Sequence, residues 1–348
     1  MRPDRVGDVV LSTPIYHTLK ISFPGSYVGA LVSSYTAPLL MNNPFIDAVI
    51  TDDPPKGGSE RGNFWKKVAE IKTHRFDTSL LLLPTQRLAY MLFFSRIRRR
   101  VGVGHILYEV ITLMDGVSRR KYNPLRHESD YVLDLARRIG ARNIWTSPEI
   151  FIEGEEREQA RKFLDRKGLA TNGQIVLVHP GSGHSSPNWK VERYIELARL
   201  LSEAGPSVLV TGGGNEKDLE LSFRQMYSRQ VATSFGELTL RELASVISLV
   251  NLHISSSTGP MHIAGAVGTP TLSMFCPMDA CSPKLWGPIG NESEIILPPQ
   301  SFCEVKCPGD PHVCTFGDGN DGITVDAVFR AAMNFLKGRE VLSEGIKQ

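Results

Sequence analysis

The chain has 348 residues, of which 41% are hydrophobic and 22% are charged, so it is long enough to form two domains of typical size. Its formal net charge of +2 is too small to indicate nucleic-acid binding, and we expect no nucleic-acid partner. No apolar run approaches the roughly 20 residues that a membrane-spanning helix needs, and the first residues lack the plan of a signal peptide. We therefore expect a cytoplasmic protein.

The chain begins with a glycine turn and a helix. Apolar residues at helical spacing follow the Gly7-Asp8 pair and predict a helix over residues 9–19. In a doubly wound α/β domain a buried strand comes before such a turn, but here the sequence starts only a few residues ahead of Gly7. We therefore expect the first strand of the N-terminal domain to be missing from this sequence.

Strands and helices alternate through the rest of the first half, which is typical of a parallel sheet with crossover helices. We expect strands at 27–32, 48–51, 78–83 and 101–103, and helices at 34–41, 64–73, 87–95 and 129–139. Turn-forming residues gather at 141–148 and place a domain boundary near residue 150. The predicted domains are 1–150 and 151–348.

The same alternation restarts in the second domain. We expect strands at 175–179, 207–211, 250–254 and 271–275, and helices at 155–167, 191–204, 216–226, 240–249 and 325–336. For the last helix, packing back on the first domain is one alternative.

The five cysteines all lie in the last quarter of the chain, and an odd number argues against a disulfide framework in the cytoplasm. The spacing of Cys303, Cys307 and Cys314 departs from the paired C-x₂-C spacing of zinc ribbons, and a metal would need His312 as a further ligand. Reduced thiols in a loop are the favoured interpretation, and we expect no metal.

Three turns rich in glycine or hydroxyl residues directly follow strands of the second domain: HPGSG at 179–183, TGGGNE at 211–216 and SSSTG at 255–259. In a parallel sheet all such turns lie at the carboxyl edge, where open α/β proteins bind their ligands. Pro260 suits the first position of a helix, whose unpaired N–H groups attract phosphate. We infer a nucleotide site at these turns, with ordinary Ser/Thr capping as the alternative.

Residue types suggest roles at this site. Glu216 is suited to accept hydrogen bonds from ribose hydroxyls, or else it is a favourable charge in the first turn of a helix. His262 could donate to a diphosphate, or it is a half-buried histidine of the core. The candidate donor-binding residues are Ser182, Gly183, Glu216, Ser257, Thr258, Gly259, Pro260, Met261 and His262.

Asp8 is the candidate catalytic residue of the first domain, as a general base that accepts a proton from a hydroxyl. The alternative is an N-cap, which the residue type alone favours. Four arginines, Arg5, Arg87, Arg98 and Arg100, could meet an anionic acceptor, although charge runs more often form a solvated face.

The chain resembles the ADP-heptose:lipopolysaccharide heptosyltransferases of the bacterial cell envelope over nearly its whole length. The resemblance rests on DRVGDVVLSTP near the start, VHPGSGHSSPNWKVERYIELA, VLVTGGGNEKD, and FGELTLRELASVISLVNLHISSSTGPMHIAGAVGTPTLSMFCP. It implies a GT-B fold, in which two Rossmann-like domains face each other across a cleft. It also implies Asp8 as the base, Glu216 on the ribose, Ser182 at the phosphates, and Thr258, Gly259 and His262 in the diphosphate turn.

The chain departs from the family pattern at two positions of the second domain. Ser257 stands where the family usually has Asp, and Pro187 stands where many members have a lysine two residues before the tryptophan, here Trp189. His184 or Lys190 could replace that lysine as a cation for the leaving diphosphate.

The resemblance and the residues together predict an inverting glycosyltransferase that moves a heptose from ADP-heptose to a lipopolysaccharide core or related anionic glycolipid. We expect no metal cofactor, and we expect peripheral contact with the cytoplasmic face of the inner membrane through the basic stretch from Arg87 to Arg100. A GT-B transferase for another nucleotide sugar and a non-catalytic nucleotide-binding homologue are the alternatives.

Overall fold

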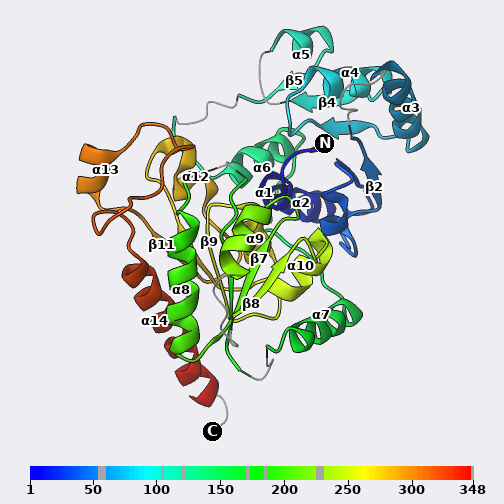
Figure 1. The fold of residues 1–348 in the computed structure, drawn as a ribbon. Helices are drawn as coiled ribbons and strands as arrows, with labels where there is room; N and C mark the ends of the chain where they lie inside the picture. The colour runs from blue at the N-terminus through cyan, green and yellow to red at the C-terminus, as the bar shows by residue number, and fades with distance from the viewer. Residues whose placement is uncertain are drawn as a thin grey trace. The chain divides into compact units, whose positions relative to one another are not determined.

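The computed structural model describes residues 1–53, 60–102, 106–118, 123–169, 173–183, 186–224 and 231–345 (Figure 1). The chain divides into two compact units, Met1–Phe151 and Ile152–Gln348. None of the helices in the described ranges has the length and apolar character needed to cross a membrane.

The second unit is built on one parallel sheet of six strands. The strands are β6 (Ile175–His179), β7 (Ser207–Gly212), β8 (Val231–Phe235), β9 (Leu252–Ser256), β10 (Thr271–Met274) and β11 (Ser293–Ile296). Their order is β11-β10-β9-β6-β7-β8, and every neighbouring pair is parallel, as predicted. This is the Rossmann order 3-2-1-4-5-6, which changes direction between β6 and β9.

Helices cover this sheet because its central strands are apolar on both faces; all five residues of β6 are buried. Figure 1 shows α8 and α14 side by side, and their buried residues share one core with alternate residues of β6, β7, β9 and β10. The helices of this unit are α7 (Gly154–Arg166), α8 (Val191–Glu203), α9 (Lys217–Arg224), α10 (Leu240–Ile247), α11 (Gly259–Ala266), η2 (Asp279–Cys281), α12 (Pro283–Trp286), α13 (Gln300–Lys306) and α14 (Val325–Gly345).

The first unit holds two parallel groups of strands. One pairs β1 (Gly29–Val32) with β2 (Ala48–Thr51), and the other has the order β3 (Thr78–Leu80), β4 (Arg99–Gly102) and β5 (Asp115–Gly116). The helices are α1 (Val6–Ser12), α2 (Pro14–Ser22), η1 (Ala37–Leu40), α3 (Glu60–Thr73), α4 (Gln86–Phe94), α5 (Leu107–Ile111) and α6 (Glu128–Arg138).

The first two residues link these groups of strands. The Met1 amine donates to the Leu80 carbonyl at 2.7 Å, and the Arg2 N–H donates to the Leu31 carbonyl at 2.8 Å. Burial lowers the pKa of the Met1 amine to about 5. Among the described residues no strand precedes α1, and Met1 and Arg2 lie between β1 and β3.

The structure corrects several of the element predictions. The helix expected over residues 9–19 is two helices, because Pro14 lacks an N–H and its ring disfavours continuation of the preceding turn. The strands β8 and β11 were not predicted, because both are edge strands without a continuous apolar run. The short helix α5 lies in a stretch where no element was expected.

Candidate functional site

The three predicted turns come together at one edge of the second sheet. Strands β9, β6 and β7 are direct neighbours in that order, and His179 at the end of β6 is in register with Ser255 of β9. On the other side, His179 Nδ1 lies 3.0 Å from Thr211 Oγ1 of β7. The turns that follow these strands therefore form one surface at the β6/β9 switch point, where Rossmann folds bind their ligands.

Glu216 joins two of these turns. The Gly213 N–H donates to Glu216 Oε2 at 2.6 Å, and the Glu216 N–H donates back to the Gly213 carbonyl at 3.0 Å. A Cβ atom on Gly181 would overlap the Glu216 carboxylate, so this side chain lies against the turn that follows β6. Glu216 thus presents a carboxylate between the β6 and β7 turns.

The third turn leads into α11. The Thr258 hydroxyl donates to Ser255 Oγ at 3.3 Å, and within the described residues its side chain makes no capping hydrogen bond to α11. Ordinary side-chain capping, the alternative considered above, is therefore not how this turn is built. Pro260 lies in the first turn, and the neighbouring backbone N–H groups of α11 remain suited to an anion.

The other predicted donor-binding residues differ in what they can contribute. Ser182 is half-buried, and Gly183 is exposed with a φ of 54°, a conformation that favours glycine. The Ser257 carbonyl accepts a hydrogen bond from Ser186 Oγ at 2.8 Å, which ties this turn to the loop after β6. Met261 is fully buried, so only its backbone can reach a ligand.

His262 is also buried, within α11. Two further histidines, His179 and His253, lie inside the sheet beneath the turns. Burial lowers the pKa of His179 to about 4 and that of His253 to about 3, so both are neutral near pH 7. Neither of these two side chains adds positive charge to the site.

Asn188 holds the first turn in place and was missed by the sequence analysis. Its side-chain N–H donates to the Pro180 carbonyl at 2.7 Å, and its Oδ1 accepts from the Tyr194 hydroxyl at 2.7 Å. The neighbouring Lys190 pairs with Asp318 at 2.8 Å on the surface, which argues against it as the replacement cation. His184, the other candidate, lies outside the described residues.

Asp8 lies in the first turn of α1, whose N-cap is Arg5, so the N-cap alternative is wrong. Its carboxylate contacts the guanidinium of Arg2, and Arg2 also donates to Glu128 Oε1 at 3.2 Å. Arg2 and Glu128 are both buried. Arg2 Nε also pairs with Asp4 at 3.5 Å. The candidate base is therefore one end of a partly buried chain of charges from Glu128 through Arg2 to Asp8.

This environment increases the basicity of Asp8. Burial raises the pKa of the Asp8 carboxyl, while the Arg2 guanidinium acts in the opposite direction and the carboxylates of Asp4 and Glu128 raise it further. A carboxylate with a raised pKa is a stronger proton acceptor that still has a counter-ion beside it. The geometry thus suits a general base.

The four arginines considered for an acceptor fall into two groups. Arg5 and Arg98 are exposed. Arg87 pairs with the buried Asp52 at 3.1 Å, and Arg100 donates to the Thr112 carbonyl at 2.8 Å and to the carbonyl of Ile97. Protein groups thus already hold the guanidiniums of Arg87 and Arg100, and contact of these two arginines with an acceptor stays a prediction.

The cysteines are free thiols. Burial raises the pKa of several of them, Cys276 and Cys314 included. In the part of the chain that the structure describes, no group of three or more His, Cys, Asp or Glu side chains is arranged to hold a metal.

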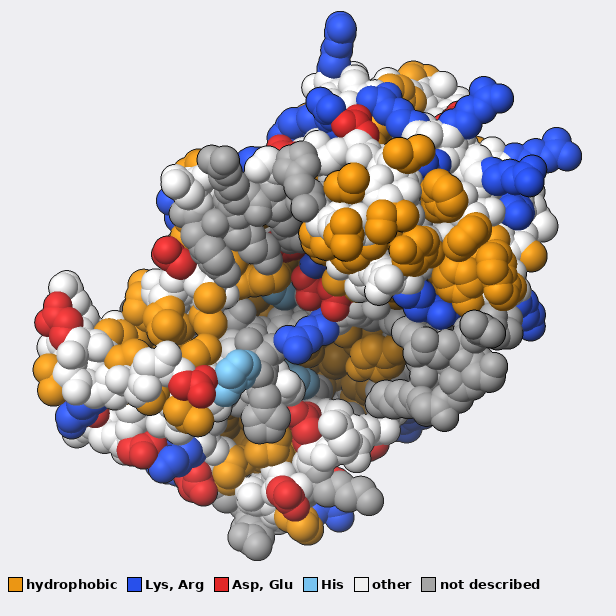
Figure 2. Space-filling view, turned by 90° about the horizontal axis from the view of Figure 1, so that it is seen from above, with side chains coloured by type: hydrophobic (Ala, Val, Ile, Leu, Met, Phe, Trp, Pro, Cys, Tyr) orange, Lys and Arg blue, Asp and Glu red, His pale blue; other side chains and the backbone are white. Residues whose placement is uncertain are grey.

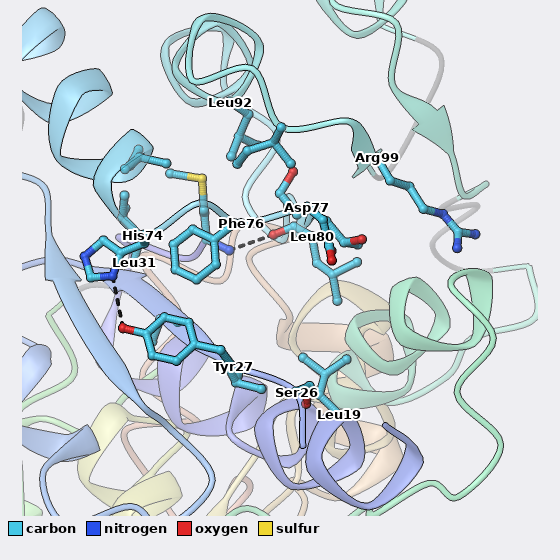
Figure 3. Close-up of a pocket in the computed structure, with 18 of the residues that line it drawn as sticks. Leu19, Ser26, Tyr27, Leu31, His74, Phe76, Asp77, Leu80, Leu92 and Arg99 are labelled. Atoms are coloured by element: carbon cyan, nitrogen blue, oxygen red, sulfur yellow. Dashed lines mark hydrogen bonds between the residues drawn. The ribbon is translucent and has the colours of Figure 1, made fainter. Parts of the chain in front are cut away.

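A cavity of about 480 Å³ lies in the first unit (Figure 3). It is lined by residues 29–31 of β1 and 78–80 of β3, and Tyr27, His74 and Phe76 lie together at one side, where the Tyr27 hydroxyl and His74 Nδ1 are 3.1 Å apart. Asp8 is not among the described residues that line it. Because the cavity lies between β1 and β3, which are not paired with each other, we attribute it to the gap in the sheet rather than to a substrate.

Comparison with known proteins gives consistent matches. A family model described as glycosyltransferase family 9 (heptosyltransferase) matches residues 65–307. A Haemophilus influenzae protein named only as a glycosyltransferase is 28% identical over 315 residues, which cover 87% of this chain and 88% of the relative. Lipooligosaccharide heptosyltransferase 2 of the same organism is 24% identical over 304 residues, covering 84% and 86%.

The solved structure of Escherichia coli ADP-heptose lipopolysaccharide heptosyltransferase II is similar with a TM-score of 0.76 at 19% identity, over 97% of this chain and 98% of that chain. This likeness, together with the parallel sheets of both units, confirms the predicted GT-B fold class.

Proposed function

Because the chain belongs to glycosyltransferase family 9, the heptosyltransferase family, we propose that it transfers a heptose from ADP-heptose to a hydroxyl of a lipopolysaccharide core or related anionic glycolipid, with inversion. Membership of this family means that the chain is a glycosyltransferase. The observation that supports a nucleotide-sugar donor best is the surface formed by the three turns at the β6/β9 switch point.

The donor is held at this surface. The N–H groups at the start of α11 and the hydroxyl of Ser182 receive the diphosphate, and the Thr258 hydroxyl joins them by turning away from Ser255 Oγ. Glu216 accepts hydrogen bonds from the ribose hydroxyls. Donor contacts of this kind stabilise the negative charge that develops on the leaving diphosphate.

Asp8 acts on the acceptor. Its carboxylate takes the proton of the acceptor hydroxyl, the hydroxyl oxygen forms a bond to the anomeric carbon, and the bond from that carbon to the diphosphate oxygen breaks, so that ADP leaves. Attack from the side opposite the leaving group inverts the anomeric configuration. Arg5 and Arg98, which are exposed, are the candidate contacts for acceptor phosphates.

The proposed mechanism requires no metal ion, because backbone N–H groups and hydroxyls serve the leaving group. We expect turnover to be unchanged, within about twofold, in the presence of EDTA. A loss of turnover in EDTA that added Mg²⁺ reverses would show that a metal takes part.

We further propose that the reaction occurs in the cytoplasm, at the inner face of the inner membrane where a glycolipid acceptor would lie.

The test is to incubate the protein with ADP-heptose and lipopolysaccharide from a heptose-deficient strain and to measure ADP release and the mass of the acceptor. We expect one heptose to be added to the acceptor for each ADP released. If the donor binds but no such acceptor is modified, the transferase proposal is wrong.

A second candidate is a transferase of the same fold that uses another nucleotide sugar. The observation that favours it is Ser257, which stands in the diphosphate turn where the family usually has a carboxylate. Thermal shifts with ADP-, UDP- and GDP-sugars separate the two candidates. The heptose proposal predicts the largest shift with ADP-heptose, and a larger shift with a UDP- or GDP-sugar would favour the second candidate.

A further inference from the structure

One surface of the first unit exposes an unusual number of large apolar side chains. They belong to the helices α3, α4 and α5 and to Leu113, which lies two residues after the end of α5. We call this surface the apolar face, and its residues are Trp65, Phe94, Leu107, Val110, Ile111 and Leu113. Monomeric proteins rarely expose such side chains in a contiguous group unless the group binds something.

The three helices are neighbours, since α4 contacts both α3 and α5. The rings of Trp65 and Phe94 lie 5.0 Å apart, and the rings of Phe93 and Phe94 lie 5.5 Å apart. The Arg100 guanidinium lies 5.4 Å from the centre of the Phe93 ring and donates to the carbonyl of Thr112, just after α5. The exposed residues of α3, α4 and α5 therefore belong to one continuous surface.

The helix α5 distributes its polar and apolar side chains in the opposite way to an ordinary surface helix. Leu107, Val110 and Ile111, spaced as one helical face, are 74%, 60% and 53% exposed. Glu109 is 2% exposed and Thr112 is fully buried. A helix that turns its polar side chains inward and its apolar side chains outward is arranged for an apolar environment outside the protein.

Leu113 supports the same conclusion. It is 75% exposed and has a φ of 53°, a backbone conformation that non-glycine residues adopt only at a cost. The fold thus holds a leucine outward in a strained turn, although a glycine would fit there without strain.

Cations accompany the apolar face. Arg96 and Arg98 directly follow α4 and are exposed, whereas the one acid among the described residues of 86–113 is the buried Glu109. Figure 2 shows a face of the molecule on which hydrophobic side chains gather with Lys and Arg side chains around them. Apolar side chains beside exposed cations match the two layers of a bilayer surface, acyl chains below anionic headgroups.

We propose that the apolar face docks on an anionic lipid bilayer, with α5 and Leu113 entering the headgroup region and Arg96 and Arg98 facing the phosphates. The proposal rests on the proposed function only in that a glycolipid acceptor would lie in the same bilayer. A protein partner fits less well, since the described residues of 86–113 offer it exposed cations but no exposed acid for complementary pairs.

The test is co-sedimentation of the full chain with vesicles of phosphatidylethanolamine and phosphatidylglycerol, and with vesicles of phosphatidylcholine alone. The test variant is the double substitution Leu107→Ser and Leu113→Ser. The control is Leu221→Ser in α9, which replaces a leucine that is likewise exposed. No nucleotide sugar is present, so the result does not depend on the identity of the donor.

We expect the native chain and the control to bind the anionic vesicles, and the double variant to bind them at least tenfold more weakly. We expect weak binding of all three proteins to phosphatidylcholine, and weaker binding to anionic vesicles for Arg96→Gln. Turnover with a water-soluble core oligosaccharide should be equal in the double variant and the native chain. The proposal would be overturned if the native chain does not bind anionic vesicles, or if the double variant binds them as well as the native chain does. It would also be overturned if the apolar face only mediates self-association of the chain.

Discussion

At the residue scale, the most informative group is the chain of charges from Glu128 through Arg2 to Asp8. A buried carboxylate beside a buried guanidinium fixes the position of that guanidinium, because breaking such a pair leaves an uncompensated charge in the interior. Arg2 in turn meets the carboxylate of Asp8. Glu128 and Arg2 are therefore positioning residues for the candidate base.

We predict that Glu128→Gln moves the acid limb of the pH profile of kcat/KM to lower pH. The charge of Glu128 raises the pKa of the Asp8 carboxyl, so its removal lowers that pKa and Asp8 stays ionised to a lower pH. ADP affinity should not change. The measurement is turnover from pH 4.5 to 8, and the control is Glu149→Gln, whose carboxylate pairs with His17 at 2.9 Å.

A shift of the acid limb to higher pH, or equal profiles for both variants, would argue against this role of Glu128.

We predict a shift in the opposite direction for Arg2→Gln, because loss of the guanidinium raises the pKa of the Asp8 carboxyl and moves the acid limb to higher pH. This variant should also lower the free energy of unfolding by about 3–5 kcal/mol, since the carboxylates of Asp4, Asp8 and Glu128 lose their counter-ion.

The sequence could identify Asp8 but not its partners. Asp8 follows a glycine at the start of a helix, which is a local signal. Arg2 and Glu128 are 126 positions apart, and their contact depends on the packing of α6 against α1. Likewise the partners of Arg87 and Arg100, a buried aspartate and backbone carbonyls, leave no local pattern in the sequence and could not be predicted from it.

At the element scale, the proposed donor site depends on close approach between the turns. The turn after β6 can lie against Glu216 only because residue 181 has no side chain. Gly214, in the turn after β7, lacks such a contact. A Cβ atom on Gly214 would have only the Cα of Gly236 nearby, at 3.6 Å.

We predict that Gly181→Ala weakens ADP binding about tenfold or more, whereas Gly214→Ala changes it less than twofold. The added methyl group at 181 displaces the Glu216 carboxylate, and at 214 it makes an ordinary van der Waals contact. Isothermal titration calorimetry with ADP measures both variants. Equal affinities in the two variants would mean that Glu216 does not contact the nucleotide.

We also predict that the free energy of unfolding decreases as the pH falls below about 6.5. The folded-state pKa values of His179 and His253, about 4 and about 3, lie below the value of 6.5 expected for the unfolded chain. The unfolded state therefore binds more protons in this range, and each histidine contributes a loss of about 2 kcal/mol at pH 5. Urea unfolding at pH 5 and pH 7 measures this loss.

The variant His253→Phe should lose less unfolding free energy between pH 7 and pH 5 than the native chain, because one of the two histidines with a lowered pKa is gone. A loss that is the same in both proteins would show that His253 is not buried as a neutral side chain. His74→Phe, at a partly exposed position of the first unit, serves as the control.

The central elements were predictable, and the edge elements were not. The bounds predicted for β6 agree with the structure, because a strand buried on both faces is a continuous apolar run. β8 and β11 lie at the two edges of the same sheet and mix polar with apolar residues. The helix α5 was missed since its apolar residues face solvent, contrary to the pattern by which surface helices are recognised.

At the scale of the whole molecule, the two units use related sheets. The second unit has the full Rossmann order, and the first has β2-β1 and β3-β4-β5 with Met1 and Arg2 between β1 and β3. The alternation of strands and helices predicted this repeated architecture from the sequence. The sequence also located the three turns that the structure brings to one edge of the sheet of the second unit, since each follows an apolar strand directly.

The central claim is that this chain transfers a sugar from a nucleotide donor with Asp8 as the base. The most direct measurement is the rate of ADP release from ADP-heptose with a heptose-deficient acceptor, for the native chain, for Asp8→Asn and for Asp53→Asn, an exposed aspartate of the same unit, as the control. We predict that Asp8→Asn lowers kcat by about 10²- to 10⁴-fold with ADP affinity unchanged, while Asp53→Asn stays within several-fold of the native rate. Native-like turnover by Asp8→Asn, or donor binding by the native chain without any turnover, would contradict the claim.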